Sequence, residues 1–142
     1  MSRKRIPQED KTQVLQRADG RCEYCKSLRK YSPQPFTIDH ILPVALRGSD
    51  ELDNLALACG GCNGHKSNKT SALDPITGRE TALFHPRTES WTDHFEWDAE
   101  FVQMIGLTPI GRATVRALKL NRPSLINLRK ITKLTGEHPP EG

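Results

Sequence analysis

The sequence has no apolar run long enough to cross a membrane, which predicts a soluble protein without a membrane partner. Its first five residues carry no apolar stretch of the kind found in secretory signals, so we expect a cytoplasmic protein rather than one exported to an oxidising compartment. It also contains no internal repeat and no long low-complexity tract. These absences favour one compact domain, and 142 residues leave room for a small appended subdomain.

The sequence also has little net charge, +4 in total, but the charge is unevenly distributed. Residues 1–66 and 104–142 carry more Lys and Arg than Asp and Glu, whereas residues 67–103 are acidic. Basic ends suit a polyanion such as nucleic acid, although exposed cations are also common on solvated surfaces. Charge alone therefore favours a nucleic-acid partner only weakly.

The four cysteines form two closely spaced pairs, Cys22-x-x-Cys25 and Cys59-x-x-Cys62. Two such pairs commonly provide the four thiolates of a tetrahedral structural zinc site. Two disulfides or redox-active pairs are the alternative, but nothing in the sequence directs the chain to an oxidising compartment. The 33 residues between the pairs exceed the spacer of an ordinary zinc ribbon, so they must contain structure of their own.

Local patterns predict an α+β core in the first half of the chain. Residues 7–18 have a proline start, two early acids and an apolar stripe, which is typical of a helix. Residues 36–42 resemble a strand and residues 55–58 a return strand, with a turn near residues 48–50. Residues 60–68 are expected to form a short helix. The order is strand, loop, strand, helix.

The second half of the chain is predicted to be a hairpin followed by helices. Two strands are expected over residues 94–97 and 101–105, and two helices over residues 110–120 and 123–133. Residues 135–142 contain glycine and prolines and are expected to be a flexible, frayed tail. We therefore expect a core domain, residues 1–72, and an extension, residues 73–142, that packs on it.

Several motifs lie between and around the two cysteine pairs. They are Cys22-x-x-Cys25, Ile38-Asp39-His40-Ile41-x-Pro43, Gly48, Asp53-Asn54-Leu55 and Cys59-x-x-Cys62-Asn63-x-x-Lys66. Together these motifs resemble the HNH endonucleases, the ββα-metal (His-Me finger) group, and in particular their four-cysteine zinc-bearing branch. The resemblance is strong over residues 6–70 and weaker in the extension. It implies a small ββα-metal core with a structural zinc ion.

The resemblance implies a role for each polar residue of these motifs. His40 would be the general base that activates water, and Asn54 would hold the loop and orient that base. Asp39 and Asn63 would bind one catalytic ion, and their oxygen atoms favour Mg²⁺ or Mn²⁺ over softer metals. Each residue also has an ordinary interpretation: a surface or core histidine, a solvated strand-end carboxylate, or a turn residue.

The remaining candidates are basic residues and one histidine. His65 is ambiguous, because it lies two residues beyond the ligand position and can be an outer-shell group, a phosphate contact or a bystander. Lys66 and Arg47 are candidates for holding the DNA backbone, or are ordinary exposed cations. Arg112, Arg116 and Lys119 recur at helical spacing and form either a DNA-binding face or a solvated one.

The sequence therefore predicts an endonuclease that hydrolyses phosphodiester bonds in DNA with a histidine base, a single Mg²⁺ or Mn²⁺ ion and a structural Zn²⁺. Two alternatives stay open: a zinc-containing nucleic-acid-binding module without cleavage activity, and an RNA endonuclease. Substrate architecture, sequence preference, nicking versus double-strand cleavage, biological role and oligomeric state stay undetermined.

Overall fold

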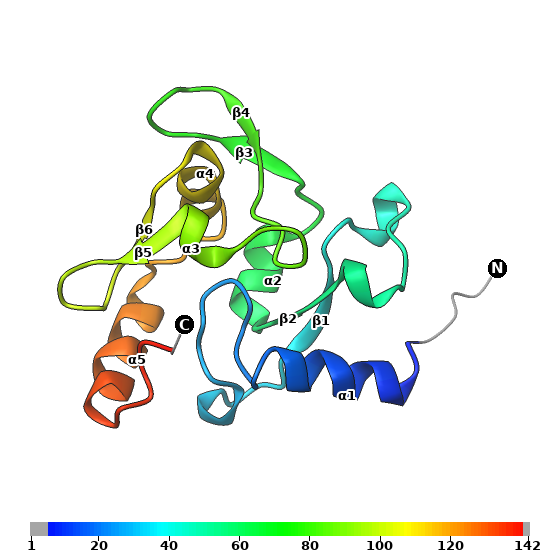
Figure 1. The fold of residues 1–142 in the computed structure, drawn as a ribbon, viewed down its shortest axis with the longest axis horizontal. Coiled ribbons are helices and arrows are strands. Elements are labelled where there is room, and N and C mark those ends of the chain that lie inside the picture. The colour runs from blue at the N-terminus through cyan, green and yellow to red at the C-terminus, as the bar shows by residue number, and fades with distance from the viewer. Residues whose placement is uncertain (1–5, 141–142) are drawn as a thin grey trace.

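The structure, a computed structural model, describes residues 6–140, and this part of the chain mixes small sheets with helices (Figure 1). Residues 1–5, on which the expectation about location depends, lie outside the described part, as do residues 141 and 142. The predicted mixture of α and β elements is confirmed. No helix in the described range is long and apolar enough to span a membrane.

Helix α1, Gln8–Arg17, confirms the predicted helix to within a residue at each end. Pro7 precedes its first turn, where the missing proline N–H costs nothing, and Glu9 and Asp10 lie near the positive end of the helix dipole. Val14 is buried in a small cluster with Leu55 and Leu57 of the next strand pair. The helix therefore covers one side of the first hairpin.

That hairpin pairs β1, Thr37–His40, with β2, Leu55–Ala58, in antiparallel register, with His40 opposite Leu55. Every residue of β2 is buried, as its apolar sequence Leu-Ala-Leu-Ala requires. Helix α2, Gly60–Lys66, follows after one residue and packs on β1. The predicted order of strand, loop, strand and helix is confirmed.

The extension contains two further hairpins and three helices. The hairpins pair β3, Ser71–Leu73, with β4, Glu80–Ala82, and β5, Phe95–Trp97, with β6, Met104–Gly106. Helix α3, Trp91–His94, leads directly into β5. Helices α4, Pro109–Ala117, and α5, Pro123–Leu134, confirm the two predicted C-terminal helices. The β3–β4 hairpin was not predicted, because only its turn, with Gly78 at positive φ, has a clear sequence signal.

The largest apolar core joins the two halves of the chain. Phe84, Phe95 and Met104 of the extension belong to the same buried cluster as Tyr24 and Ala56 of the first half. The rings of Phe84 and Phe95 meet edge to face, with centroids 5.1 Å apart. The cysteine pairs lie within this cluster, so the extension closes over the side of the core that carries them.

Residues 135–140 differ from the frayed tail expected from the sequence. Glu137 pairs with Lys30 and accepts a hydrogen bond from Tyr31, and His138 is buried with its Nε2 2.7 Å from the Phe101 carbonyl oxygen. The side chain of Lys30 lowers the pKa of Glu137 to about 2. The end of the described chain thus lies against the segment that follows α1.

Candidate active site

The four cysteine side chains meet at one buried point. Their sulfur atoms all lie within 4.8 Å of one another, and Cys25 Sγ is 3.7 Å from Cys59 Sγ. Tetrahedral zinc–sulfur bonds of about 2.3 Å would place the sulfurs ~3.8 Å apart, whereas a disulfide needs about 2.05 Å. All four cysteines are free. The cluster therefore suggests a structural zinc site and argues against the two-disulfide interpretation.

A cation from the extension reaches this cluster. The two terminal nitrogens of Arg122 lie 3.5 Å from Cys59 Sγ and 3.6 Å from Cys62 Sγ. Burial acts to lower the pKa of Arg122, but Cys62, Cys25 and Cys59 together outweigh it, and the pKa is raised. A side chain at Gly61 would approach Arg122 Nη2 to 2.5 Å, so a glycine here keeps the approach open. Arg122 therefore offsets part of the negative charge that four thiolates around a divalent ion would carry.

A separate shallow hollow of about 440 Å³ gathers three of the predicted site residues. Asp39 and His40 enter it from β1, and Asn63 enters it from α2. The hairpin and the following helix are packed together, which explains how residues more than twenty positions apart line one surface. Ile38, Pro43, Val44, Gly64, Ser67 and Asn68 complete the lining.

His40 is held by a carboxylate that was not predicted as a site residue. Its Nε2 lies 2.8 Å from Asp50 Oδ1, and both side chains are partly buried. An ionised carboxylate only accepts hydrogen bonds, so Nε2 carries a proton and donates it to Asp50. In the sequence, Asp50 is part of the turn Gly48-Ser49-Asp50, and nothing in that turn indicates its contact with His40.

Asn54 fixes the loop that brings Asp50 to His40. Its amide oxygen accepts a hydrogen bond from the Leu42 N–H, and its amide nitrogen donates to the carbonyl oxygens of Leu42 and Ser49. Gly48 permits this closure, because a Cβ there would lie only 1.6 Å from the Leu42 carbonyl oxygen. Asn54 therefore makes the loop contacts that its expected role requires.

The structure does not place Lys66 at the surface, where it was expected to contact a DNA phosphate. Its side chain is only 2% exposed, and its Nζ lies 3.2 Å from Asp39 Oδ2. It also donates to the carbonyl oxygens of His40 and Ile41. Tyr24 donates a 2.7 Å hydrogen bond to the same carboxylate, and burial together with Asp39 raises the tyrosine pKa well above its usual range. Lys66 is thus a buried partner of Asp39 that ties α2 to β1.

The other basic candidates divide into two groups. Arg112 forms a bidentate pair with the fully buried Asp74, at 2.9 Å for both contacts, and this hydrogen bonding holds the pKa of Asp74 well below its usual range. Arg112 is therefore engaged by Asp74, and its expected contact with DNA stays a prediction. Arg47, Arg116 and Lys119 are exposed, and their expected contacts with DNA stay predictions.

His65 does not line the hollow. Burial, and then the positive charges of Arg122, Lys119 and Lys69, lower its pKa, so the imidazole is neutral near pH 7. These cations show that the C-terminal basic segment comes close to the end of α2. His65 therefore lies on a positively charged surface next to the hollow rather than inside it.

Comparison with known proteins bears on the segment that carries the motifs. The family model described as HNH endonuclease matches residues 22–69, a segment that contains both cysteine pairs and the residues of the hollow. This segment is therefore similar to the HNH endonucleases, and the resemblance inferred from its motifs is confirmed. No curated protein and no solved structure gives a significant match. The family suggests a nuclease or nucleic-acid-binding role.

Proposed function

We propose that this protein is a metal-dependent endonuclease that hydrolyses phosphodiester bonds in DNA. The observation that carries the proposal is the shared hollow, where Asp39, His40 and Asn63 meet at one surface that is open enough to admit a phosphate group. In this proposal residues 1–72 form the ββα-metal nuclease core and residues 73–142 support it. The exposed Arg47, Arg116 and Lys119 would hold the DNA backbone, as salt-dependent phosphate contacts.

His40 acts as the general base. Its Nε2–H is held by Asp50, and the imidazole oriented in this way accepts a proton from a water molecule that attacks the phosphorus. As the imidazole becomes positively charged, the adjacent Asp50 carboxylate stabilises it. The rigid loop held by Asn54 keeps this pair in place and limits the reorganisation needed during the reaction.

The donor set of the hollow suits a hard divalent cation. Asp39 offers a carboxylate oxygen and Asn63 an amide oxygen, both of which favour Mg²⁺ or Mn²⁺. When bound, such an ion supplies electrostatic stabilisation to the negative charge on the phosphate and the leaving oxygen. Lys66 holds Asp39 from the protein side, which fixes the carboxylate but also competes for its charge. The four cysteines would bind zinc structurally, since four thiolates leave no open position for substrate.

Nicking of supercoiled plasmid DNA with Mg²⁺ tests the proposal. Wild-type protein should convert the plasmid to nicked or linear forms, and His40→Ala should slow this step by about 10²- to 10⁴-fold, because only the base is lost. DNA affinity, measured in parallel, should change little. Cleavage by His40→Ala at the wild-type rate would remove His40 from the mechanism.

The buried Asp39–Lys66 pair favours one alternative, a nucleic-acid-binding module without cleavage activity, because the lysine already neutralises the expected metal ligand. Tight DNA binding by wild-type protein with no Mg²⁺- or Mn²⁺-dependent cleavage would support that module. A parallel assay on structured RNA distinguishes the third reading, an RNA endonuclease, by preferential cleavage of the RNA.

A further inference from the structure

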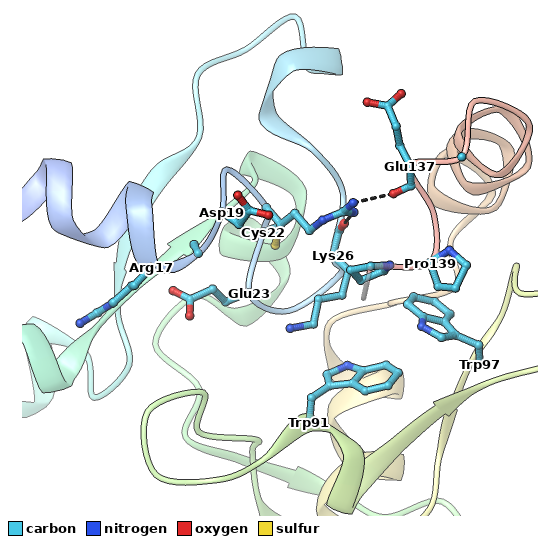
Figure 2. Close-up of a pocket in the computed structure, with 13 residues that line it drawn as sticks. Arg17, Asp19, Cys22, Glu23, Lys26, Trp91, Trp97, Glu137 and Pro139 are labelled. Carbon is cyan, nitrogen blue, oxygen red and sulfur yellow. Dashed lines mark hydrogen bonds between the residues drawn. The ribbon is translucent and has the colours of Figure 1, made fainter. Parts of the chain in front are cut away.

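A second cavity, of about 460 Å³, lies between the segment after α1, the α3–β5 region and the end of the described chain (Figure 2). It shares no lining residue with the hollow around His40. Its volume is within the range of small-ligand sites. Figure 2 shows Trp91, Trp97, Lys26 and Pro139 arranged around one common space. The proposed endonuclease chemistry makes no use of this cavity.

One wall of the cavity is a preformed aromatic surface. The rings of Trp91 and Trp97 lie 5.4 Å apart, and Trp91 also stacks on Phe95 at 5.7 Å. The Arg129 guanidinium lies 5.0 Å from the Trp97 ring and is itself buried and hydrogen bonded to carbonyl oxygens, so it fixes this indole from behind the wall. Tryptophan surfaces held in this way can stack on a flat ligand without first becoming ordered.

The opposite wall carries three cations, Arg17, Arg21 and Lys26. Within residues 6–140, no ion pair joins these three side chains to an acidic side chain. Arg21 donates to the carbonyl oxygens of Lys26 and Glu137, and the carboxylates of Asp19 and Glu137 attract its guanidinium group.

The acids of the cavity wall are largely neutralised by cations that lie outside it. Glu23 is paired with Arg87, and Glu137 is paired with Lys30. Asp19 is then the remaining carboxylate in the lining, which also contains the three cations Arg17, Arg21 and Lys26. The wall therefore keeps an excess of positive charge.

Lys26 links the charged and aromatic walls. Its Nζ lies 5.9 Å from the centroid of Trp91, at the outer limit of a cation–π contact, so a ligand can displace it at little cost. Arg17 donates to the Leu55 carbonyl oxygen, and Arg21 donates to those of Lys26 and Glu137, so an anion would engage the remaining N–H groups of these two guanidinium groups.

We propose that this cavity binds a single nucleotide unit, with the base against the tryptophans and the phosphate on the cations. Stacking on an indole tolerates any base, because every base has an aromatic face, and the guanidinium groups provide directed donors for phosphate oxygens. An acidic peptide would use the cations but leave the aromatic wall without a flat partner. A nucleotide uses both walls. The site accepts a free nucleotide or one exposed in a single strand.

The chain itself provides the reporter, because its two tryptophans both line this cavity. The experiment measures tryptophan fluorescence of zinc-loaded, full-length His40→Ala protein, which leaves nucleic acid uncut. The probes are thymidine 5′-monophosphate, inorganic phosphate, a short single-stranded oligodeoxynucleotide, its duplex and oligoglutamate. We expect saturable quenching by the mononucleotide and by the single strand, competition without strong quenching by phosphate, and weaker quenching by the duplex.

Two pairs of variants test the walls. Lys26→Met retains the aliphatic stem and should weaken nucleotide binding by about 10-fold, as expected for loss of a charged contact. Lys130→Met removes the same charge from an exposed position outside the cavity and should leave the affinity unchanged. Arg17→Gln, at the exposed end of α1, gives a second test should Lys26→Met fail to fold, and its control is Arg79→Gln, an exposed arginine outside the cavity.

The proposal is overturned if no nucleotide gives saturable quenching, if oligoglutamate quenches as well as the single strand, or if the cavity variants bind like their controls. Plasmid nicking by wild-type protein is measured separately. Nicking without nucleotide quenching would reject the cavity proposal alone, and quenching without nicking would reject the endonuclease proposal alone.

Discussion

At the scale of single residues, the pairing of His40 with Asp50 gives Asp50 a testable role. Asp50→Ala removes the acceptor of the His40 Nε2–H group, so the imidazole loses its fixed orientation. We expect the turnover rate in plasmid nicking to fall by about 10-fold or more, but by less than the 10²- to 10⁴-fold expected for loss of the base itself. The half-saturating DNA concentration should stay the same.

The conservative variant distinguishes positioning from general destabilisation. Asp50→Asn keeps an oxygen acceptor without the charge and should recover part of the turnover lost in Asp50→Ala. Thermal unfolding of both variants is the control. Equal rates for the alanine variant and the wild type would show that Asp50 does not position His40.

The buried pair of Lys66 and Asp39 makes a prediction about stability. Lys66→Met would leave the Asp39 carboxylate buried beside Tyr24 without a cation, so we expect the free energy of unfolding to fall by about 3–5 kcal/mol. Lys69→Met is the matched control, because its exposed Nζ contacts only the His65 carbonyl oxygen and its loss should change little. Urea denaturation measures both. Equal stability of the two variants would contradict a structural role for Lys66.

The sequence could identify candidate site residues where residue type and short-range spacing together define a motif. The cysteines, Asp39, His40 and Asn63 belong to short motifs, and the structure gathers them as those motifs suggest. The pairing of Lys66 and Arg112 with acidic residues was not predicted, because polar side chains suggest exposure and the acidic partners lie 27 and 38 positions away. Pairing over such distances follows from tertiary packing, which no local pattern encodes.

At the scale of elements, the loop between β1 and β2 carries Asp50 and so determines the orientation of the His40 imidazole. Gly48→Ala would place a Cβ 1.6 Å from the Leu42 carbonyl oxygen, so the loop must shift and the Asn54 hydrogen bonds must weaken. We expect plasmid nicking to fall by about 10-fold or more, while helix content measured by circular dichroism stays close to the wild-type value.

Gly60→Ala is the control for that substitution. A Cβ at Gly60 meets no atom within 4 Å, and alanine is favourable in a helix, so nicking should be retained and stability should hold or rise slightly. Full activity in Gly48→Ala would show that the loop tolerates rearrangement and that its closure does not position the site.

The elements themselves were predictable where periodicity and boundary signals agreed. Helix α5 begins at Pro123 as its sequence indicates, and β2 coincides with its apolar run. The three-residue strands β3 and β4 were missed because segments this short show no clear alternation. Their position depends on packing against α4, a contact that the local sequence does not reveal.

At the scale of the whole molecule, Arg122 makes metal retention depend on the extension. Arg122→Gln removes a cation from the Cys59 and Cys62 sulfurs, so we expect zinc affinity to fall by about 10- to 100-fold, as for loss of other groups that support metal ligands. Competition with a chromophoric chelator measures the affinity. Lys119→Gln, an exposed neighbour with the same change in charge, should bind zinc like the wild type.

Arg122→Lys tests whether charge alone is sufficient. A lysine keeps the charge but lacks the planar pair of donors that contacts two sulfurs, so its zinc affinity should lie between those of the wild type and Arg122→Gln. Zinc affinity unchanged in all three variants would mean that the extension contacts the cluster without stabilising it.

The sequence separation between Arg122 and the cysteines also has a consequence during synthesis on the ribosome. Arg122 follows Cys62 by 60 positions, so the complete set of thiols leaves the exit tunnel well before its arginine partner is made. A metal ion can therefore enter the nascent cluster while that side is still open. Once the extension has folded, Arg122 lies against two of the four sulfurs, so we expect an ion bound by the cysteines to exchange more slowly in the complete chain than in the nascent one.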